Sequence, residues 1–194
     1  ANNPDLIIMD EPLSSLDVTA RRETAQILAD NAGSARLVIT HDLDTAGRLA
    51  ENIAVLYGGR IVEAGLSREV LTNPKHPYTR ALIRAYPNMT TVKDLQAIRG
   101  HMSRPFAPGC PFQPRCTQDV EICGRQAPEL TGDSRKVACH RGGIITRLDI
   151  RNLTVRYGNF TAVEAVDLTI MAGETVALVG ESGSGKTTLA SAIT

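Results

Sequence analysis

The sequence predicts an α/β fold in two parts that flank a loop-rich lobe holding all the cysteines. In residues 1–72, short apolar runs alternate with segments of helical spacing, which is typical of an α/β domain. The four cysteines all lie within residues 110–139, in a stretch rich in proline and glycine. From residue 145 a second series of apolar strands leads into a glycine-rich loop.

Composition and charge argue against several classes of protein. Hydrophobic residues make up 42% of the chain and charged residues 22%, which is ordinary for a globular protein. The formal net charge is zero, so no basic excess indicates a nucleic-acid partner. No apolar run approaches the roughly 18 to 20 residues that cross a bilayer, so any role at a membrane would come through partner subunits. Residues 1–12 also lack the basic region of a signal peptide.

The first part is predicted to run strand, helix, strand, helix and hairpin. Continuous apolar residues predict buried strands, and apolar residues at helical spacing predict helices. Asp42 is a suitable cap for the second helix, and Gly58-Gly59 is a suitable hairpin turn. The expected ranges are strands at 6–9 and 36–40, helices at 18–31 and 42–49, and hairpin strands at 53–57 and 60–64.

The rest of the chain is predicted to change character twice. A short helix is expected at 77–86, with Pro77 in its first turn. Residues 87–142 show little periodicity, and a loop-rich stretch of this length is expected to be held together by an internal cross-link or a bound metal. After it, strands are expected at 148–157, 160–170 and 175–179, with the last one buried, followed by a helix from Lys186.

Residues 180–187 read GESGSGKT, which fits the phosphate-binding spacing G-x-x-x-x-G-K-[ST] between a predicted strand and a predicted helix. Glycines let successive N–H groups point at phosphate oxygens, and the helix N-terminus adds positive charge. Lys186 is expected to bridge the β- and γ-phosphates, and Thr187 to offer its hydroxyl to Mg²⁺. Tyr157 either stacks on adenine or is an ordinary strand-end tyrosine. The candidate nucleotide-binding residues are Tyr157, Gly180, Glu181, Ser182, Gly183, Ser184, Gly185, Lys186, Thr187 and Thr188.

Two adjacent carboxylates end the first predicted strand, in the run LIIMDEP. Asp10 is expected to hold Mg²⁺, and Glu11 to orient or deprotonate the attacking water, because phosphoryl transfer depends on positioning and charge stabilisation. His41 ends the next strand, where it would reach a γ-phosphate. Glu11 and His41 are therefore the candidate catalytic residues.

These motifs resemble those of ABC ATPases. The carboxylate run resembles Walker B, Ser14, Ser15, Leu16 and Asp17 resemble the D-loop at the dimer interface, and ITHD resembles the H-loop. GESGSGKT resembles Walker A and the RYG at 156–158 the adenine-stacking A-loop, which implies P-loop NTPase elements that use ATP and Mg²⁺. NPKHPYTRALIRAYP at 73–87, PGCPFQPRC at 108–116 and ACH at 138–140 resemble the C-terminal extension of dipeptide/oligopeptide (peptide/nickel) importer ATPases. Leu13 stands where that family has a small polar residue, and we expect it to be tolerated.

The order of the motifs is reversed relative to a single ABC domain, where Walker A precedes Walker B. No LSGGQ-like signature occurs in the sequence, which argues against a circular permutation. The resemblance therefore implies an internal fragment of a tandem ATPase, with 1–72 from the first domain, 73–143 as the extension and 144–194 from the second domain. Asp10 and Lys186 would then serve different ATP molecules, and the chain alone is expected to hydrolyse ATP at background rate.

Cys110, Cys116, Cys123 and Cys139 have neither the CxxC pairs of a zinc ribbon nor the run of a ferredoxin. The resemblance implies that they hold a [4Fe–4S] cluster in a structural role, because a small loop-rich lobe lacks core. Structural zinc, free thiols and disulfides are the alternatives, with His140 as a possible substitute ligand.

The resemblance implies a nucleotide-binding subunit that powers peptide uptake from the cytoplasmic face of the inner membrane, as a peripheral protein. Its partners would be transmembrane permease subunits, a substrate-binding protein and a second ABC ATPase domain in a head-to-tail dimer. The alternatives are a soluble tandem ABC ATPase acting on nucleic acid or ribosomes, and a non-catalytic metal-binding lobe. Tandem ATPases of that kind carry CxxC zinc pairs or an N-terminal ferredoxin-like lobe, which this sequence lacks, and no nucleic-acid partner is expected.

Overall fold

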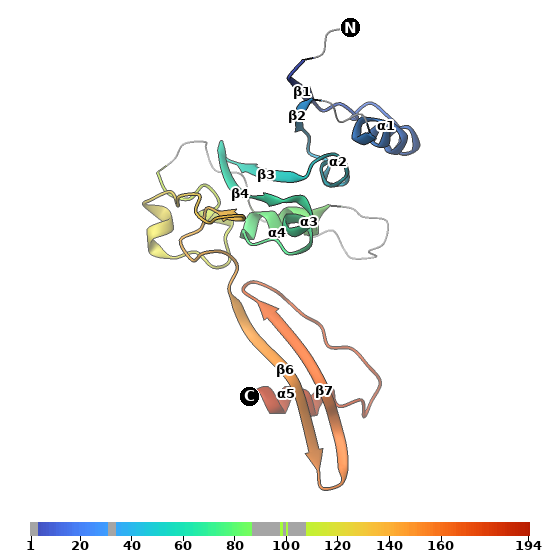
Figure 1. The fold of residues 1–194 in the computed structure, drawn as a ribbon. Coiled ribbons are helices and arrows are strands. Elements are labelled where there is room, and N and C mark those ends of the chain that lie inside the picture. Colours follow the sequence, from blue (N-terminus) through green and yellow to red (C-terminus); the bar gives the residue numbers. More distant parts are fainter. Residues whose placement is uncertain (1–3, 31–33, 87–97, 99, 101–107) are drawn as a thin grey trace. The chain divides into compact units, whose positions relative to one another are not determined.

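The computed structural model describes residues 4–30, 34–86, 98, 100 and 108–194. The chain divides into two compact units, Ala1–Gly143 and Ile144–Thr194 (Figure 1). Residue 31 of the first expected helix and much of 87–107 lie outside the described residues. In the part of the chain that the structure describes, no helix combines the length and the apolar character needed to cross a membrane.

The first unit begins with a parallel strand pair, β1 (Leu6–Asp10) and β2 (Ala35–Ile39), connected by helix α1 (Val18–Asp30). Asp17 starts α1, because its carboxylate accepts hydrogen bonds from the N–H groups of Thr19 and Ala20, each at 2.9 Å.

The prediction that both strands are buried is wrong. Leu6, Ile8 and Leu37 are 54%, 62% and 51% exposed. Parallel strands become buried only where further strands flank them and helices cover both faces. Among the described residues, β1 and β2 form a sheet of two strands only, so their apolar side chains stay accessible.

The predicted hairpin is confirmed as β3 (Asn52–Tyr57) and β4 (Arg60–Leu66). Gly58 and Gly59 both have positive φ, 55° and 75°, as a tight two-residue hairpin turn requires. The predicted helix before the hairpin is α2 (Leu43–Leu49), capped by Asp42 as expected. Helix α3 (Ser67–Thr72), which follows β4 directly, was not predicted from the sequence.

The cysteine lobe is as poor in regular structure as predicted. Its described residues hold two 3₁₀ turns, η1 (Gln113–Arg115) and η2 (Glu121–Gly124), and one short strand, β5 (Lys136–Val137). β5 pairs with β4 and so makes the hairpin a three-stranded sheet. The lobe therefore folds onto the preceding segment and is not a separate body.

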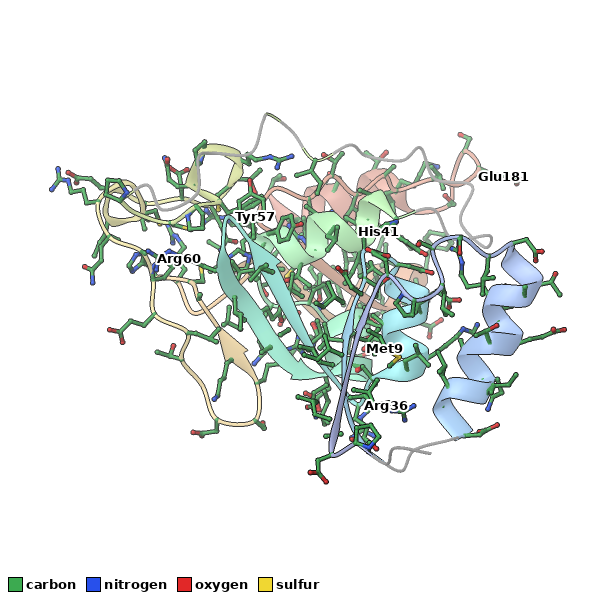
Figure 2. All side chains as sticks on the ribbon, turned by 90° about the horizontal axis from the view of Figure 1, so that it is seen from above. Met9, Arg36, His41, Tyr57, Arg60 and Glu181 are labelled. Atoms are coloured by element: carbon green, nitrogen blue, oxygen red, sulfur yellow. The ribbon has the colours of Figure 1, made fainter. Side chains whose placement is uncertain are left out.

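One apolar core joins the hairpin, α3, the predicted helix α4 (Pro77–Ala85) and the cysteine lobe. Tyr57, at the turn end of the hairpin, lies beside α4 (Figure 2). Its ring centroid is 4.4 Å from that of Tyr78 in α4 and 5.3 Å from that of Phe112 in the lobe. Aromatic pairs at these separations stabilise beyond the area they bury.

A buried carboxylate ties the same parts together. Glu63 on β4 is fully buried and accepts hydrogen bonds from the N–H groups of Lys75 at 2.8 Å and His76 at 2.9 Å. It also forms an ion pair with the nearly buried side chain of Arg135, which donates to the Asn73 carbonyl at 2.7 Å. A buried charge is tolerated when it is paired and fully hydrogen-bonded, so Glu63 fixes the start of α4 against β4 and the lobe.

The second unit is built on the antiparallel hairpin of β6 (Thr146–Tyr157) and β7 (Phe160–Met171), as predicted. The predicted buried strand at 175–179 is wrong: these residues form no strand, and Val179 is 86% exposed. A strand needs a neighbour for its backbone hydrogen bonds, and no described segment pairs with 175–179. Helix α5 (Lys186–Ile193) starts at Lys186 as expected.

The buried histidine at the start of α4 predicts that the free energy of unfolding depends on pH. Buried His76 caps the helix by accepting a hydrogen bond from the Tyr78 N–H at 3.1 Å, and burial lowers its pKa from 6.5 to about 4. Between these values the unfolded chain binds a proton that the folded chain does not. The free energy of unfolding should therefore fall by roughly 3 kcal/mol as the pH drops from 6.5 to about 4.

Urea unfolding over this pH range measures the effect. His76→Asn keeps an acceptor at the cap but cannot titrate, so it should remove this part of the slope. Equal slopes for the variant and the unchanged chain would contradict the assignment.

Candidate functional site

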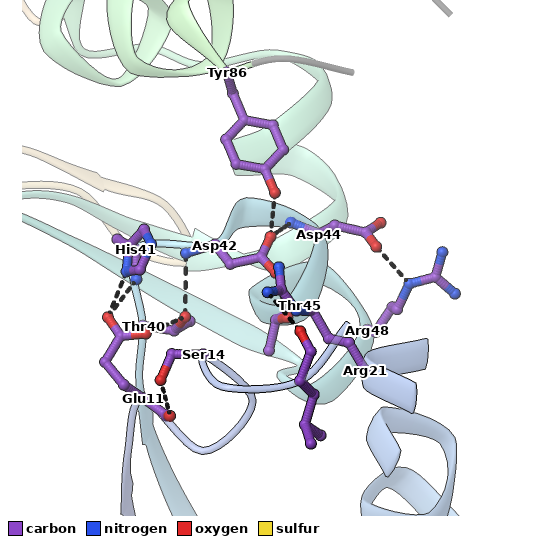
Figure 3. A network of polar contacts seen from close by, with 11 residues as sticks. Glu11, Ser14, Arg21, Thr40, His41, Asp42, Asp44, Thr45, Arg48 and Tyr86 are labelled. Carbon is purple, nitrogen blue, oxygen red and sulfur yellow. Dashed lines mark hydrogen bonds and ion pairs between the residues drawn. The ribbon is translucent and has the colours of Figure 1, made fainter. Parts of the chain in front are cut away.

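Glu11 and His41, the two candidate catalytic residues, lie in direct contact (Figure 3). Glu11 follows β1, and its N–H donates to the Ile39 carbonyl at 2.8 Å, which extends the β1–β2 pairing by one residue. Its carboxylate accepts from the His41 N–H at 3.0 Å and lies 2.7 Å from Nδ1 of the His41 ring. Parallel strands end at the same edge of a sheet, which is why residues 30 apart in sequence meet here.

The surroundings of Glu11 keep it ionised. Its hydrogen bond with the His41 side chain is the main cause that lowers the Glu11 pKa, and the Thr40 hydroxyl, 3.3 Å from Oε2, acts in the same direction. The His41 side chain is 82% exposed, so the ring is held by one nitrogen and open to an incoming group on its other side. This arrangement can hold a water or a phosphate oxygen in place.

A small cavity of about 50 Å³ lies against this pair, lined by Glu11, Leu13, Ser14, Arg21, Thr40, His41, Asp42 and Thr45. A cavity of this size and polarity accommodates water and is far too small for a nucleotide. It is therefore large enough for a water molecule and not for a nucleotide.

The other residues predicted near this pair differ in their exposure and in their hydrogen bonds. Asp10 is the exposed last residue of β1, and its carboxylate is accessible to a cation. The Ser14 hydroxyl donates to the Glu11 carbonyl at 3.0 Å, so Ser14 contacts the Walker-B-like segment. Ser15 is exposed, and the Leu16 carbonyl accepts from Arg21 at 3.2 Å. Leu13 is only 3% exposed, so the residue that departs from the family pattern packs into the interior.

Asp42 is more than the helix cap that the sequence predicted. Its carboxylate accepts from the hydroxyls of Thr45 and Tyr86 and lies 3.4 Å from Arg21. Burial acts to raise the Asp42 pKa, but the hydrogen bonds from Thr45, Tyr86 and Asp44 outweigh it and the net shift is downward. The only sequence signal for this site was the position of Asp42 directly after His41.

In the second unit the glycine-rich loop has the predicted curl. Gly183 and Gly185 have φ of 84° and 87°, a conformation that favours glycine. The Lys186 ammonium lies inside the loop and donates to the carbonyls of Gly180 at 2.8 Å and Glu181 at 2.5 Å and to the Ser184 hydroxyl at 3.1 Å. Ser182 and Thr187 are exposed, and Thr188 is partly exposed.

Strand β7 supports the loop, a contact that the sequence did not predict. A methyl group on Gly185 would lie 2.5 Å from the Ala162 carbonyl oxygen and 3.3 Å from the Val163 side chain. Tyr157 and Phe160 face each other at the tip of the same hairpin, 61% and 66% exposed. The ring of Tyr157 is thus free to stack on a flat ligand. The loop and this ring belong to the second unit, and Glu11 and His41 belong to the first.

The four cysteines are free thiols gathered in one lobe. The Cys110 N–H donates to the Cys123 carbonyl at 2.7 Å, burial raises the Cys110 pKa, and burial raises the Cys116 pKa to about 11. Within the described residues, no three His, Cys, Asp or Glu side chains are grouped so that they could hold a metal ion. His140 instead places Nε2 2.8 Å from the Gln126 carbonyl. The expected metal centre is therefore not supported by this geometry.

The close contact of Gly185 with β7 predicts a difference between two glycines. Gly183→Ala and Gly185→Ala both impose positive φ on alanine, at about 1–3 kcal/mol, but only Gly185→Ala also collides with β7. Because the Leu189 N–H donates to the Gly185 carbonyl at 2.8 Å, Gly185→Ala should speed hydrogen exchange at Leu189 by about tenfold or more. Gly183→Ala should change it much less. Equal exchange rates in the two variants would refute the role of the β7 contact.

Two family models match separate parts of the chain. The model for the C-terminal region of oligopeptide/dipeptide transporters matches residues 62–123, and the ABC transporter model matches residues 163–194. The first runs from within β4 through α3 and α4 to η2 in the cysteine lobe, and the second covers most of β7, the glycine-rich loop and α5.

Curated proteins of the same kind are similar over most of the chain. The oligopeptide transport ATP-binding protein OppD of Mycobacterium tuberculosis is 30% identical over 97% of this chain and 38% of its own length. The dipeptide transport ATP-binding protein DppD of Haemophilus influenzae is 38% identical over 72% of this chain and 44% of its own. The peptidoglycan transport ATP-binding protein YejF of Agrobacterium fabrum is 34% identical over 100% of this chain and 30% of its own. The chain thus spans less than half the length of these relatives.

Together the matched models and relatives show that the chain belongs to the oligopeptide/dipeptide family of ABC transporter ATP-binding proteins.

Proposed function

We propose that this chain is part of the nucleotide-binding subunit of a peptide-importing ABC transporter, which hydrolyses ATP to drive uptake. The contact between Glu11 and His41 at the edge of β1 and β2 carries the proposal, because it holds an ionised carboxylate and an imidazole beside a water-sized cavity. The relatives are named as ATP-binding proteins of peptide, oligopeptide and dipeptide transport, which supports the same substrate class.

In this proposal Glu11 orients the attacking water and accepts its proton, and His41 contacts the γ-phosphate. The pKa of Glu11 is lowered, so its charge is available at neutral pH, and electrostatic stabilisation is strongest where such groups are already in place. Asp10 and Thr187 would each hold Mg²⁺ in their respective domains, since an exposed carboxylate and a hydroxyl are ligands that this ion prefers. The ion would neutralise charge that develops on the phosphate oxygens.

In this proposal Lys186 binds phosphate oxygens of ATP, because its ammonium already lies inside the glycine-rich loop. Its partners, the carbonyls of Gly180 and Glu181, are neutral acceptors. Charge-assisted hydrogen bonds to an anion are stronger, so phosphate oxygens would replace these carbonyls as partners. The Tyr157 ring would stack on the adenine.

We further propose that the loop and the Glu11–His41 pair belong to successive ATPase domains of a tandem protein. Residues 1–72 would come from the first domain, 73–143 from its extension and 144–194 from the second. The alignments with OppD and YejF support this, because each covers nearly all of this chain within one longer relative. Its partners would be permease subunits, a substrate-binding protein and a second ATPase domain across Ser14–Asp17, on the cytoplasmic face of the membrane. No feature of the described residues favours a nucleic-acid or ribosomal role.

The catalytic assignment predicts which kinetic constant changes in the full-length ATPase that carries this sequence. Glu11→Gln should lower kcat for ATP by about 100-fold or more and leave ATP binding intact, because it removes the base and not a phosphate contact. Lys186→Ala should instead weaken binding of the ATP at the loop of the second domain. Turnover and fluorescent-nucleotide binding measure the two effects.

Glu23→Gln is the matched control, because Glu23 is an exposed carboxylate on α1 away from the cavity. Turnover of Glu11→Gln within twofold of the unchanged protein would sink the catalytic assignment.

We also propose that the cysteine lobe binds a [4Fe–4S] cluster, with zinc as the alternative. The ligands would be Cys110, Cys116, Cys123 and Cys139. Four free thiols in one lobe, together with the family resemblance, support it. Among the described residues the thiols form no group that could hold a metal, so binding would have to rearrange them and to overcome the raised pKa of Cys116. Anaerobically purified protein should then be brown and contain iron, by absorption spectroscopy and metal analysis. A colourless protein with stoichiometric zinc would exclude the cluster.

A further inference from the structure

Asp42 receives hydrogen bonds from several separate segments of the first unit (Figure 3). Its Oδ1 accepts from the Asp44 N–H at 3.0 Å and from the Tyr86 hydroxyl, and its Oδ2 accepts from the Thr45 hydroxyl at 2.6 Å and lies 3.4 Å from Arg21 Nη1. The whole residue is only 8% exposed. Charge-assisted hydrogen bonds in such surroundings are among the stronger ones in a protein.

Tyr86 is the distant member of this set. It lies at the C-terminal cap of α4, 44 residues beyond Asp42, in the region that matches the oligopeptide/dipeptide extension. Burial first, and then the hydrogen bond to Asp42, raise the Tyr86 pKa to about 12, so the phenol stays protonated and remains a donor at neutral pH. The extension therefore contacts the H-loop-like segment through one hydroxyl group.

The segment from Thr40 to Asp42 is held from both sides. On one side, Glu11 accepts from the His41 N–H at 3.0 Å and lies 3.3 Å from the Thr40 hydroxyl, which itself accepts from the Asp42 N–H at 3.1 Å. On the other side, Tyr86 and Arg21 hold the Asp42 carboxylate. Arg21 also donates to the Leu16 carbonyl at 3.2 Å, so the D-loop-like turn belongs to the same network.

We propose that Tyr86 is a positioning residue for ATP hydrolysis: through Asp42 it fixes the backbone that presents His41 to Glu11. This rests on the proposed function, and it gives the extension a role in the chemical step. The Tyr86 hydroxyl bonds Asp42, whereas Glu11 bonds His41, so the effect of Tyr86 passes through Asp42. A displaced His41 would lower the rate of hydrolysis, because small errors in the position of a catalytic group are costly.

Hydrogen exchange in the 194-residue chain tests the contact without any need for turnover. Tyr86→Phe removes the hydroxyl and keeps the ring. The amides of His41, Asp42 and Asp44 should then exchange about 3- to 10-fold faster, because each of them bonds within this network. Amides of the β3–β4 hairpin should keep their rates.

Tyr57→Phe is the matched control. The buried Tyr57 hydroxyl also bonds a charged partner, Arg115 Nη1 at 3.1 Å, but it lies in the aromatic core and not at Asp42. It should cost similar stability and leave exchange at His41, Asp42 and Asp44 unchanged. If Tyr57→Phe accelerates these amides as much as Tyr86→Phe does, the effect is general destabilisation and the proposal is overturned.

Turnover in the full-length ATPase is the second readout. Tyr86→Phe should lower kcat about 3- to 10-fold with KM for ATP within twofold, because the lost hydrogen bond acts on the hydrolytic pair and not on the phosphate-binding loop. In an Asp42→Ala background the same change should alter kcat less than twofold, since the acceptor of the Tyr86 hydrogen bond is already gone. Additive effects in this cycle, or an unchanged kcat and exchange for Tyr86→Phe, would overturn the proposal.

The two hypotheses fail in different ways. If the unchanged protein hydrolyses no ATP, the proposed function falls, whereas the exchange experiment still decides whether Tyr86 orders the His41 segment. If Glu11→Gln abolishes turnover but Tyr86→Phe has no effect, the function stands and the positioning role falls.

Discussion

The buried charge of Glu63 is the interaction on which the first unit depends. A carboxylate removed from water must be compensated, and here Arg135 and the N–H groups of Lys75 and His76 do so. These partners come from the cysteine lobe and from the segment that enters α4. Satisfying one charge therefore fixes the lobe, the hairpin and the start of α4 against each other.

The placement of α4 has consequences at its other end. Because its start is anchored at Glu63, its C-terminal cap brings the Tyr86 hydroxyl to Asp42, one residue from His41. The segment that resembles a C-terminal extension is thereby connected to Glu11 and His41 through two buried carboxylates, Glu63 and Asp42. The second unit uses a different device, in which the absence of a side chain at Gly185 lets the phosphate-binding loop lie against β7.

Several features were predictable because they depend on neighbouring residues. The cap at Asp42, the proline in the first turn of α4, the Gly58-Gly59 turn and the start of α5 all follow from local backbone and hydrogen-bonding preferences. The burial of β1 and β2 and the strand at 175–179 were wrong, because burial and pairing depend on what else packs there. The cysteine spacing likewise did not indicate that the thiols, among the described residues, form no group that could hold a metal.

The sequence alone determined the chemistry that is available: a phosphate-binding loop, a carboxylate pair at a strand end, a histidine at the next strand end, and their reversed order along the chain. It could do so because these motifs are contiguous and their spacing reflects local geometry. Only the tertiary structure decided that Glu11 binds His41, that Asp42 accepts from Arg21 and Tyr86, and that Glu63 pairs with Arg135. Those contacts join residues 21 to 72 positions apart, where no local preference operates.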